Sequence, residues 1–140
     1  MSDAGWEPFD AESDVGVRGW GTTRGEAFAQ ATLGVFALLV GPDQVQVLEQ
    51  REVRAQAEGP EALLVAWIEE CLYVHEIEGF VVRAVDMSRC TDTLAHGVLH
   101  GEPLDPTRHR LGAAVKGATH HRVAVEERDG SHEVRVMVRV

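Results

Sequence analysis

The sequence has 140 residues, with 23 Asp and Glu against 13 Lys and Arg, which gives a formal net charge of −10. Its hydrophobic content of 44 % and charged content of 26 % are typical of a soluble globular protein, and the length suits a single domain over residues 1–140. The negative charge argues against a stand-alone nucleic-acid-binding protein, because cationic side chains supply most of that affinity. It favours association with a basic partner instead.

The chain has no apolar run of about 20 residues, the length needed to cross a membrane, and residues 1–10 do not resemble a secretory signal. We therefore expect a cytoplasmic protein, with flexibility only in residues 1–5.

Alternating residues at 15–20 predict the first strand. Apolar residues at helical spacing predict a helix over 24–40, with Thr23 as N-cap and Glu26 completing a capping box.

The remaining elements follow from the same patterns. Period-two valines and alanines at 45–57 predict one long strand or two short ones, and Gly59-Pro60 opens a second helix that Gly79 ends. Further strands are predicted at 80–87, 93–99, 113–125 and 133–140, the last two joined by a hairpin turn at 128–131. This order predicts an α+β fold, a two-layer domain with two helices packed on a largely antiparallel or mixed sheet.

Acidic, basic and imidazole side chains gather with Pro and Gly in residues 101–121, which predicts a functional surface loop between strands; the alternative is a long connection with a solvated salt-bridge face. Asp105 begins an Asp-Pro-Thr-Arg sequence typical of a type I turn, so its role is structural, or it forms a hydrogen-bonded cluster with Glu102 and His109. Lys116 is either functional or a solvated strand residue.

Motifs of common enzyme classes are absent from the sequence. It contains no phosphate-binding glycine loop and no nucleophile elbow. Cys71 is expected to be buried and Cys90 to lie in a turn, and no Cys-x-x-Cys spacing indicates a metal or redox site. His96 and His100 are too far apart on a strand to share one zinc ion, so we expect them to be ordinary surface histidines.

Four colinear segments carry a resemblance to a known family. The segments are GE-x-LD-x-x-RH followed by VK-x-A-T-x-H, DAESDVGVRGWG (10–21), LLVAWIEECLYVHEIEG (63–79) and HEVRVMVRV (132–140). They resemble the archease family, whose members activate the RtcB-type tRNA-splicing RNA ligase by promoting its guanylylation and multiple turnover. The resemblance implies a non-enzymatic activator in tRNA splicing or RNA repair that meets RNA only through the ligase. It also implies that Glu102, Asp105, His109 and Lys116 face the partner or fix the loop.

The resemblance further implies a cation site, such as a calcium site, built from an aspartate of an HTAD motif and an aspartate next to the C-terminus. Asp14 occupies the first position, but Ala11 and Glu12 replace the histidine and threonine of the motif, and Arg139 replaces the second aspartate. Arginine has no lone pair to offer a cation. We therefore predict an Asp14–Arg139 ion pair in place of the metal; a site retained by Asp10, Glu12 and Asp14, or solvated side chains, are the alternatives.

Two other functions remain open from the sequence. One is a chaperone-like modulator of an RNA-modifying enzyme such as a methyltransferase. The other is a metal-dependent hydrolase that uses Asp105 and His109 as acid and base.

Overall fold

The computed structural model describes residues 3–11 and 14–140. Neither α-helix in these ranges is long and apolar enough to span a membrane. The described elements are, in chain order, β1 (Gly5–Ala11), β2 (Asp14–Gly21), α1 (Arg24–Leu39), the 3₁₀-helix η1 (Pro42–Gln44), β3 (Glu49–Gln56), α2 (Pro60–Glu78), β4 (Phe80–Cys90), β5 (Leu94–Pro103), β6 (Gly117–Arg128) and β7 (Ser131–Arg139).

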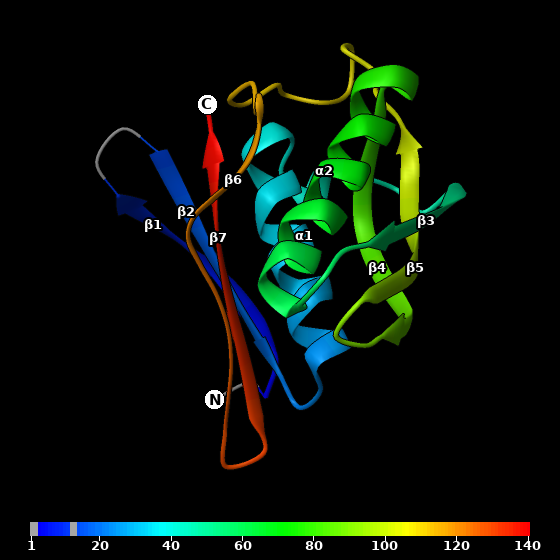
Figure 1. The fold of residues 1–140 in the computed structure, drawn as a ribbon. Coiled ribbons are helices and arrows are strands. Elements are labelled where there is room, and N and C mark those ends of the chain that lie inside the picture. Colours follow the sequence, from blue (N-terminus) through cyan, green and yellow to red (C-terminus); the bar gives the residue numbers. More distant parts are fainter. Residues whose placement is uncertain (1–2, 12–13) are drawn as a thin grey trace.

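The strands form two antiparallel sheets with the helices between them (Figure 1). The first sheet has the order β1-β2-β7-β6 and the second the order β3-β5-β4. The α+β class with two helices and antiparallel strands is confirmed, but the expected single sheet is divided in two, so that the domain has three layers. The reason lies in α1, because its buried residues cover more than half of the helix circumference and none of residues 24–39 is exposed, so one sheet cannot cover it alone.

Local signals set the limits of both helices as predicted. The Thr23 side chain accepts a hydrogen bond from the backbone N–H of Glu26 (3.0 Å), and the Glu26 carboxylate accepts from the N–H of Thr22 (2.7 Å), one residue before the expected position. α2 begins at Pro60 and ends at Glu78, and its C-cap is Gly79, whose φ of 64° is the left-handed conformation that favours glycine.

The core contains one polar link between the helices. The indole N–H of Trp67, which is fully buried in α2, donates to the Thr32 hydroxyl of α1 (2.8 Å). That hydroxyl donates to the Phe28 carbonyl one turn earlier (2.7 Å). Both polar groups are therefore satisfied inside the apolar core, as buried polar groups must be.

The structure corrects several predicted elements. The first strand is β1, which was not predicted; Gly5 belongs to it rather than to a flexible end, and residues 1–2 lie outside the described residues. Only 49–56 of the predicted 45–57 strand is a strand, and residues 45–48 between η1 and β3 have no regular secondary structure. β5 continues to Pro103, and β6 begins at Gly117 rather than at residue 113. Glu102 is therefore part of a strand rather than of a surface loop.

Candidate functional site

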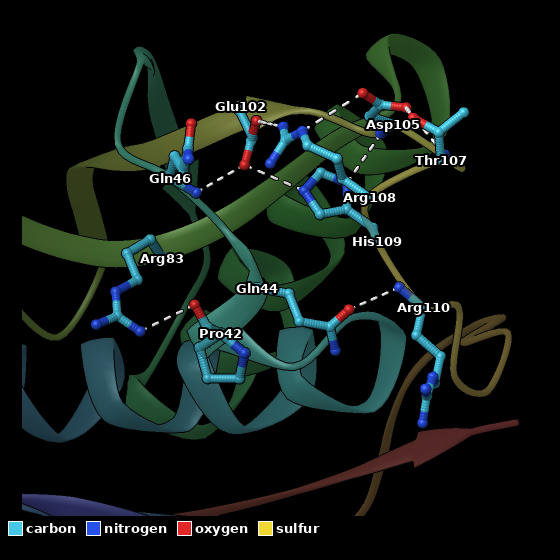
Figure 2. A network of polar contacts seen from close by, with 10 residues as sticks. All are labelled: Pro42, Gln44, Gln46, Arg83, Glu102, Asp105, Thr107, Arg108, His109 and Arg110. Carbon is cyan, nitrogen blue, oxygen red and sulfur yellow. Dashed lines mark hydrogen bonds and ion pairs between the residues drawn. The ribbon is translucent and has the colours of Figure 1, made fainter.

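The centre of the 101–121 region is the carboxylate of Glu102, which is 1 % exposed near the end of β5 (Figure 2). Its Oε2 accepts hydrogen bonds from the backbone N–H of Gln46 (2.6 Å) and from Nε2 of His109 (3.1 Å). Its Oε1 accepts from the guanidinium of Arg108. Three donors from two segments far apart in the sequence thus converge on one buried carboxylate. We call Gln46, Glu102, Asp105, Arg108 and His109 the Glu102 cluster.

The hydrogen bonds fix the tautomer of His109, which is itself 4 % exposed. The backbone N–H of Asp105 donates to its Nδ1 (2.9 Å), so this nitrogen is an acceptor. A neutral imidazole then carries its proton on Nε2, which donates to Glu102. Both ring nitrogens are occupied, so His109 has no free site for proton transfer.

Asp105 is a turn residue and also a member of the cluster, so both interpretations of the sequence are correct. Its Oδ1 accepts from the N–H and the hydroxyl of Thr107 (2.9 and 2.6 Å), and its carbonyl accepts from the N–H of Arg108 (3.0 Å). The two bonds from Thr107 lower the pKa of Asp105, and the neighbouring Arg108 lowers it further. Asp105 thus builds the turn that presents Arg108 and His109 to Glu102.

The charge of Glu102 is stabilised despite its burial. Burial by itself raises the pKa of this carboxyl, but the hydrogen bonds from Gln46, Arg108 and His109 and the charge of Arg108 outweigh it. The pKa of Glu102 therefore lies below its ordinary value, and the group is ionised near neutral pH. Because donors occupy both of its oxygens, this carboxylate serves as an anchor rather than as a general base.

The segment that follows β5, residues 104–116, is hydrogen-bonded to the C-terminal ends of both helices. The N–H groups of Gly112 and Ala113 donate to the carbonyls of Leu39 and Leu38 (2.7 and 2.8 Å), which satisfies carbonyls at the C-terminal end of α1. Gly112 is needed here, because a Cβ at this position would lie 2.3 Å from the Leu38 oxygen. The N–H of Leu104 donates to the Gly79 carbonyl after α2 (2.6 Å).

Lys116 lies apart from the Glu102 cluster. Its backbone N–H donates to the Arg139 carbonyl (2.7 Å), just before β6 begins. Its side chain is exposed, forms no ion pair with any described residue, and lines a groove beside α2. The four predicted partner-binding residues are thus divided: Glu102, Asp105 and His109 fix the loop, whereas Lys116 reaches an open surface.

The predicted Asp14–Arg139 ion pair is not formed. Val15 pairs with Val138 across β2 and β7, so Asp14 and Arg139 are at the next cross-strand position. No ion pair joins their side chains in the described part of the chain. The Arg139 guanidinium lies instead beside Gly117 and the carboxylate of Glu69, since a Cβ added to Gly117 would lie 3.1 and 3.2 Å from these groups. The arginine side chain is long enough to reach this position instead of the carboxylate of Asp14 across the sheet.

The residues at this sheet edge do not fit the cation site that the resemblance implies. Within residues 3–11 and 14–140, no three His, Cys, Asp or Glu side chains are grouped closely enough to hold a metal ion. Asp14 has an arginine, which offers no lone pair, at the opposing cross-strand position in place of a second carboxylate, and Glu12 lies outside the described residues. We assign no chemical step to a metal here.

Sequence reasoning missed two members of the Glu102 cluster. The sequence pattern predicts Arg108 only as a turn residue. Its position six residues after Glu102 is a signal from which an ion pair between the two could have been predicted. Gln46 contributes only its backbone N–H, so no side-chain pattern could have revealed it. The surface histidines, by contrast, are as predicted: His96 pairs with Glu52 (2.8 Å) and His100 with Asp86 (2.9 Å).

Comparison with known proteins places this fold and site in context. Residues 6–140 match the model of the Archease protein family (MTH1598/TM1083). Protein archease of Pyrococcus abyssi is 33 % identical over 125 residues, covering 87 % of this chain and 88 % of the relative. That of Thermococcus kodakarensis is 37 % identical over 126 residues, with coverage of 87 % and 88 %.

Solved structures have the same architecture. The solution structure of protein 1598 of Methanobacterium thermoautotrophicum superposes with a TM-score of 0.79 at 28 % identity, covering 97 % of this chain and 99 % of that one. The crystal structure of TM1083 from Thermotoga maritima, described as an archease and possible chaperone, gives a TM-score of 0.61 at 14 % identity, covering 96 % of each chain. At this lower identity the likeness concerns the fold alone.

Proposed function

The chain belongs to the archease family, and on that basis we propose that it is a protein activator of an RtcB-type RNA ligase. The observation that carries this proposal is the match to the family model over residues 6–140, which is nearly the whole chain. In this proposal the protein promotes guanylylation of the ligase and its repeated turnover, and it contacts RNA only through the ligase.

The site supports a non-enzymatic role. The alternative of a hydrolase needs Asp105 and His109 to act as acid and base, but both nitrogens of His109 and one carboxylate oxygen of Asp105 already hold hydrogen bonds to Asp105, Glu102 and Thr107. The Glu102 carboxylate is likewise saturated by its three donors. A hydrogen-bonded network around the buried Glu102 and His109 suits the rigid presentation of a surface better than it suits proton transfer.

The charge of the chain supports a basic partner. A net charge of −10 repels RNA and steers the protein toward the cationic surface that an RNA ligase needs for its substrate. We propose that the exposed side of segment 104–116 contributes to this contact, with the Glu102 cluster holding the segment in one conformation. A segment ordered before binding loses less entropy on association than a flexible one.

The test is RNA ligation by the RtcB-type ligase of the same organism, under single-turnover and multiple-turnover conditions, with and without this protein. The proposal predicts stimulation that is largest under multiple turnover. A chaperone, which is described as a possible role of the Thermotoga maritima relative, would instead suppress light scattering by an unrelated heat-denatured protein as well as by the ligase. Stimulation of the ligase without protection of the unrelated protein supports the activator.

A further inference from the structure

A groove of about 590 Å³ lies between the exposed face of α2 and segment 104–116. Buried and half-buried apolar side chains contribute to its lining, namely Leu39, Leu72, Leu104 and Val115. Polar and exposed side chains complete it. We define the α2 groove by six of its lining residues: Glu69, Tyr73, His75, Glu76, Leu104 and Lys116. Polar and apolar groups thus contribute about equally to the lining of this groove, a mixture that suits a protein segment with both apolar and charged side chains.

One face of α2 presents an aromatic anchor to this groove. Glu69, Tyr73 and Glu76 are spaced i, i+4 and i+7, so they lie on the same side of the helix. Tyr73 is 59 % exposed, and Ile77 one turn later is 63 % exposed. Tyrosine is one of the residue types, with tryptophan and arginine, that are enriched among the residues carrying most of the binding energy at protein interfaces.

His75 adds a hydrogen-bond acceptor. Its Nδ1 lies 2.9 Å from the Phe80 carbonyl, which can only accept, so Nδ1 carries the proton. The neutral ring then has its lone pair on Nε2, which has no partner among the described residues. Since no buried side-chain nitrogen or oxygen in the described structure lacks a partner, this nitrogen is accessible from outside. A donor group in the groove would complete its hydrogen bonding.

The polar groups of the groove are mostly acceptors. The Glu76 carboxylate forms no ion pair with a described residue, and Glu69 uses only one oxygen, which accepts from the N–H of Ala118 (2.9 Å). The Arg139 guanidinium lies beside Glu69, which leaves the Glu76 carboxylate and Nε2 of His75 as the groove acceptors without a partner among the described residues. An occupant rich in donors and positive charge complements this arrangement, whereas the phosphates of a nucleic acid do not.

We propose that the α2 groove docks a basic segment of the protein partner. An apolar side chain of that segment packs against Tyr73 and Leu104, and a lysine or arginine donates to Glu76 and to Nε2 of His75. This inference rests on the proposed function only in that the occupant belongs to a protein partner. The proposal also gives Lys116 a role, because its side chain lines the groove. Lys116 belongs to segment 104–116, which the Glu102 cluster anchors.

The groove can be tested without the partner by two synthetic peptides, the basic sequence RLRFRL and the acidic sequence ELEFEL. Each is titrated into the ¹⁵N-labelled protein and followed by amide chemical shifts. We expect the basic peptide to move the resonances of Tyr73, Glu76 and Leu104, and the acidic peptide to leave them unchanged. Equal binding of the two peptides, or shifts confined to another surface, would overturn the proposal.

Charge reversal supplies matched controls. Glu76→Lys should weaken the Kd of the basic peptide by about tenfold, because it removes an acceptor and adds repulsion. Glu58→Lys makes the same change of charge at an exposed residue before α2 that has no ion pair in the described structure, and its Kd should stay within about twofold. Thermal melting confirms that both variants are folded. An unchanged Kd for Glu76→Lys would contradict the assignment.

Binding to the RtcB-type ligase of the same organism separates the two proposals. If the wild-type protein binds the ligase, Tyr73→Ala and Glu76→Lys should each weaken the Kd by about tenfold while Glu58→Lys does not. Wild-type-like Kd values for both groove variants would overturn docking in this groove and leave the activator role intact. If the wild-type protein does not bind or stimulate the ligase, the activator role fails, and the peptide titration alone decides whether the groove takes a basic segment.

Discussion

Replacing Glu102 by glutamine tests the anchoring role of the Glu102 cluster with almost no change of shape. The amide oxygen can still accept from Gln46 and His109, but these bonds lose the carboxylate charge, and each weakens by about 1 kcal/mol. The new NH₂ group faces the Arg108 guanidinium, another donor, and a buried donor without an acceptor costs about 1–3 kcal/mol. Arg108 is 41 % exposed and can turn to solvent, so its lost ion pair adds little.

We therefore expect Glu102→Gln to lower the free energy of unfolding by about 3–5 kcal/mol. The assay is urea denaturation followed by the fluorescence of the three tryptophans, together with amide hydrogen exchange of segment 104–116. Exchange in this segment should accelerate more than exchange in the core of α1. Glu52→Gln is the matched control, since that side chain is 73 % exposed and its loss should change stability by at most about 0.5 kcal/mol.

The pH dependence of the same comparison gives an independent check. The folded-state pKa of Glu102 is lowered, so its contribution to stability is complete above the unfolded pKa of about 4.3 and is lost as the pH falls through the folded pKa. The stability difference between wild type and Glu102→Gln should be constant at pH 6–7 and shrink at pH values below about 4. A difference under about 1 kcal/mol at pH 7, with segment 104–116 as protected as in wild type, would refute the anchoring role.

Three further outcomes are expected. Gly112→Ala should cost about 1–3 kcal/mol and increase hydrogen exchange in segment 104–116, because its Cβ would lie 2.3 Å from the Leu38 oxygen; unchanged exchange would show that the contact is not needed. In a calorimetric titration with calcium, wild type and Asp14→Ala should give the same result. Calcium binding that is present in wild type and lost in Asp14→Ala would prove that a cation site exists. Cys90 should react slowly with a thiol reagent at pH 8 in the native protein, because burial raises its pKa to about 11, and rapid labelling would contradict this.

The elements that could be predicted are those with local causes. α1 is set by its cap at Thr23 and the Gly41-Pro42 break, and α2 by Pro60 and Gly79, all of which are readable within one turn of the chain. β1 could not be predicted because residues 5–11 form a strand by pairing with β2, and no local sequence pattern indicates that pairing. The division of the strands into two sheets likewise depends on how both helices are covered rather than on any single segment.

The candidate site shows the same limit. Glu102, Asp105 and His109 could be selected because they fall within eight residues around a Pro-rich turn. The third donor to the carboxylate comes from Gln46, which η1 brings to the cluster from 56 residues earlier. Cross-strand register was predicted correctly for Asp14 and Arg139, but register does not decide where a long side chain goes.

The most direct measurement is the initial rate at which the RtcB-type ligase of the same organism incorporates labelled guanylate from GTP, with this protein added below stoichiometric amounts. The account predicts that wild type and Glu58→Lys accelerate guanylylation equally, and that Glu76→Lys needs about ten times more protein for the same rate. No acceleration by the wild-type protein at any concentration would contradict the claim that this chain is an activator of the ligase.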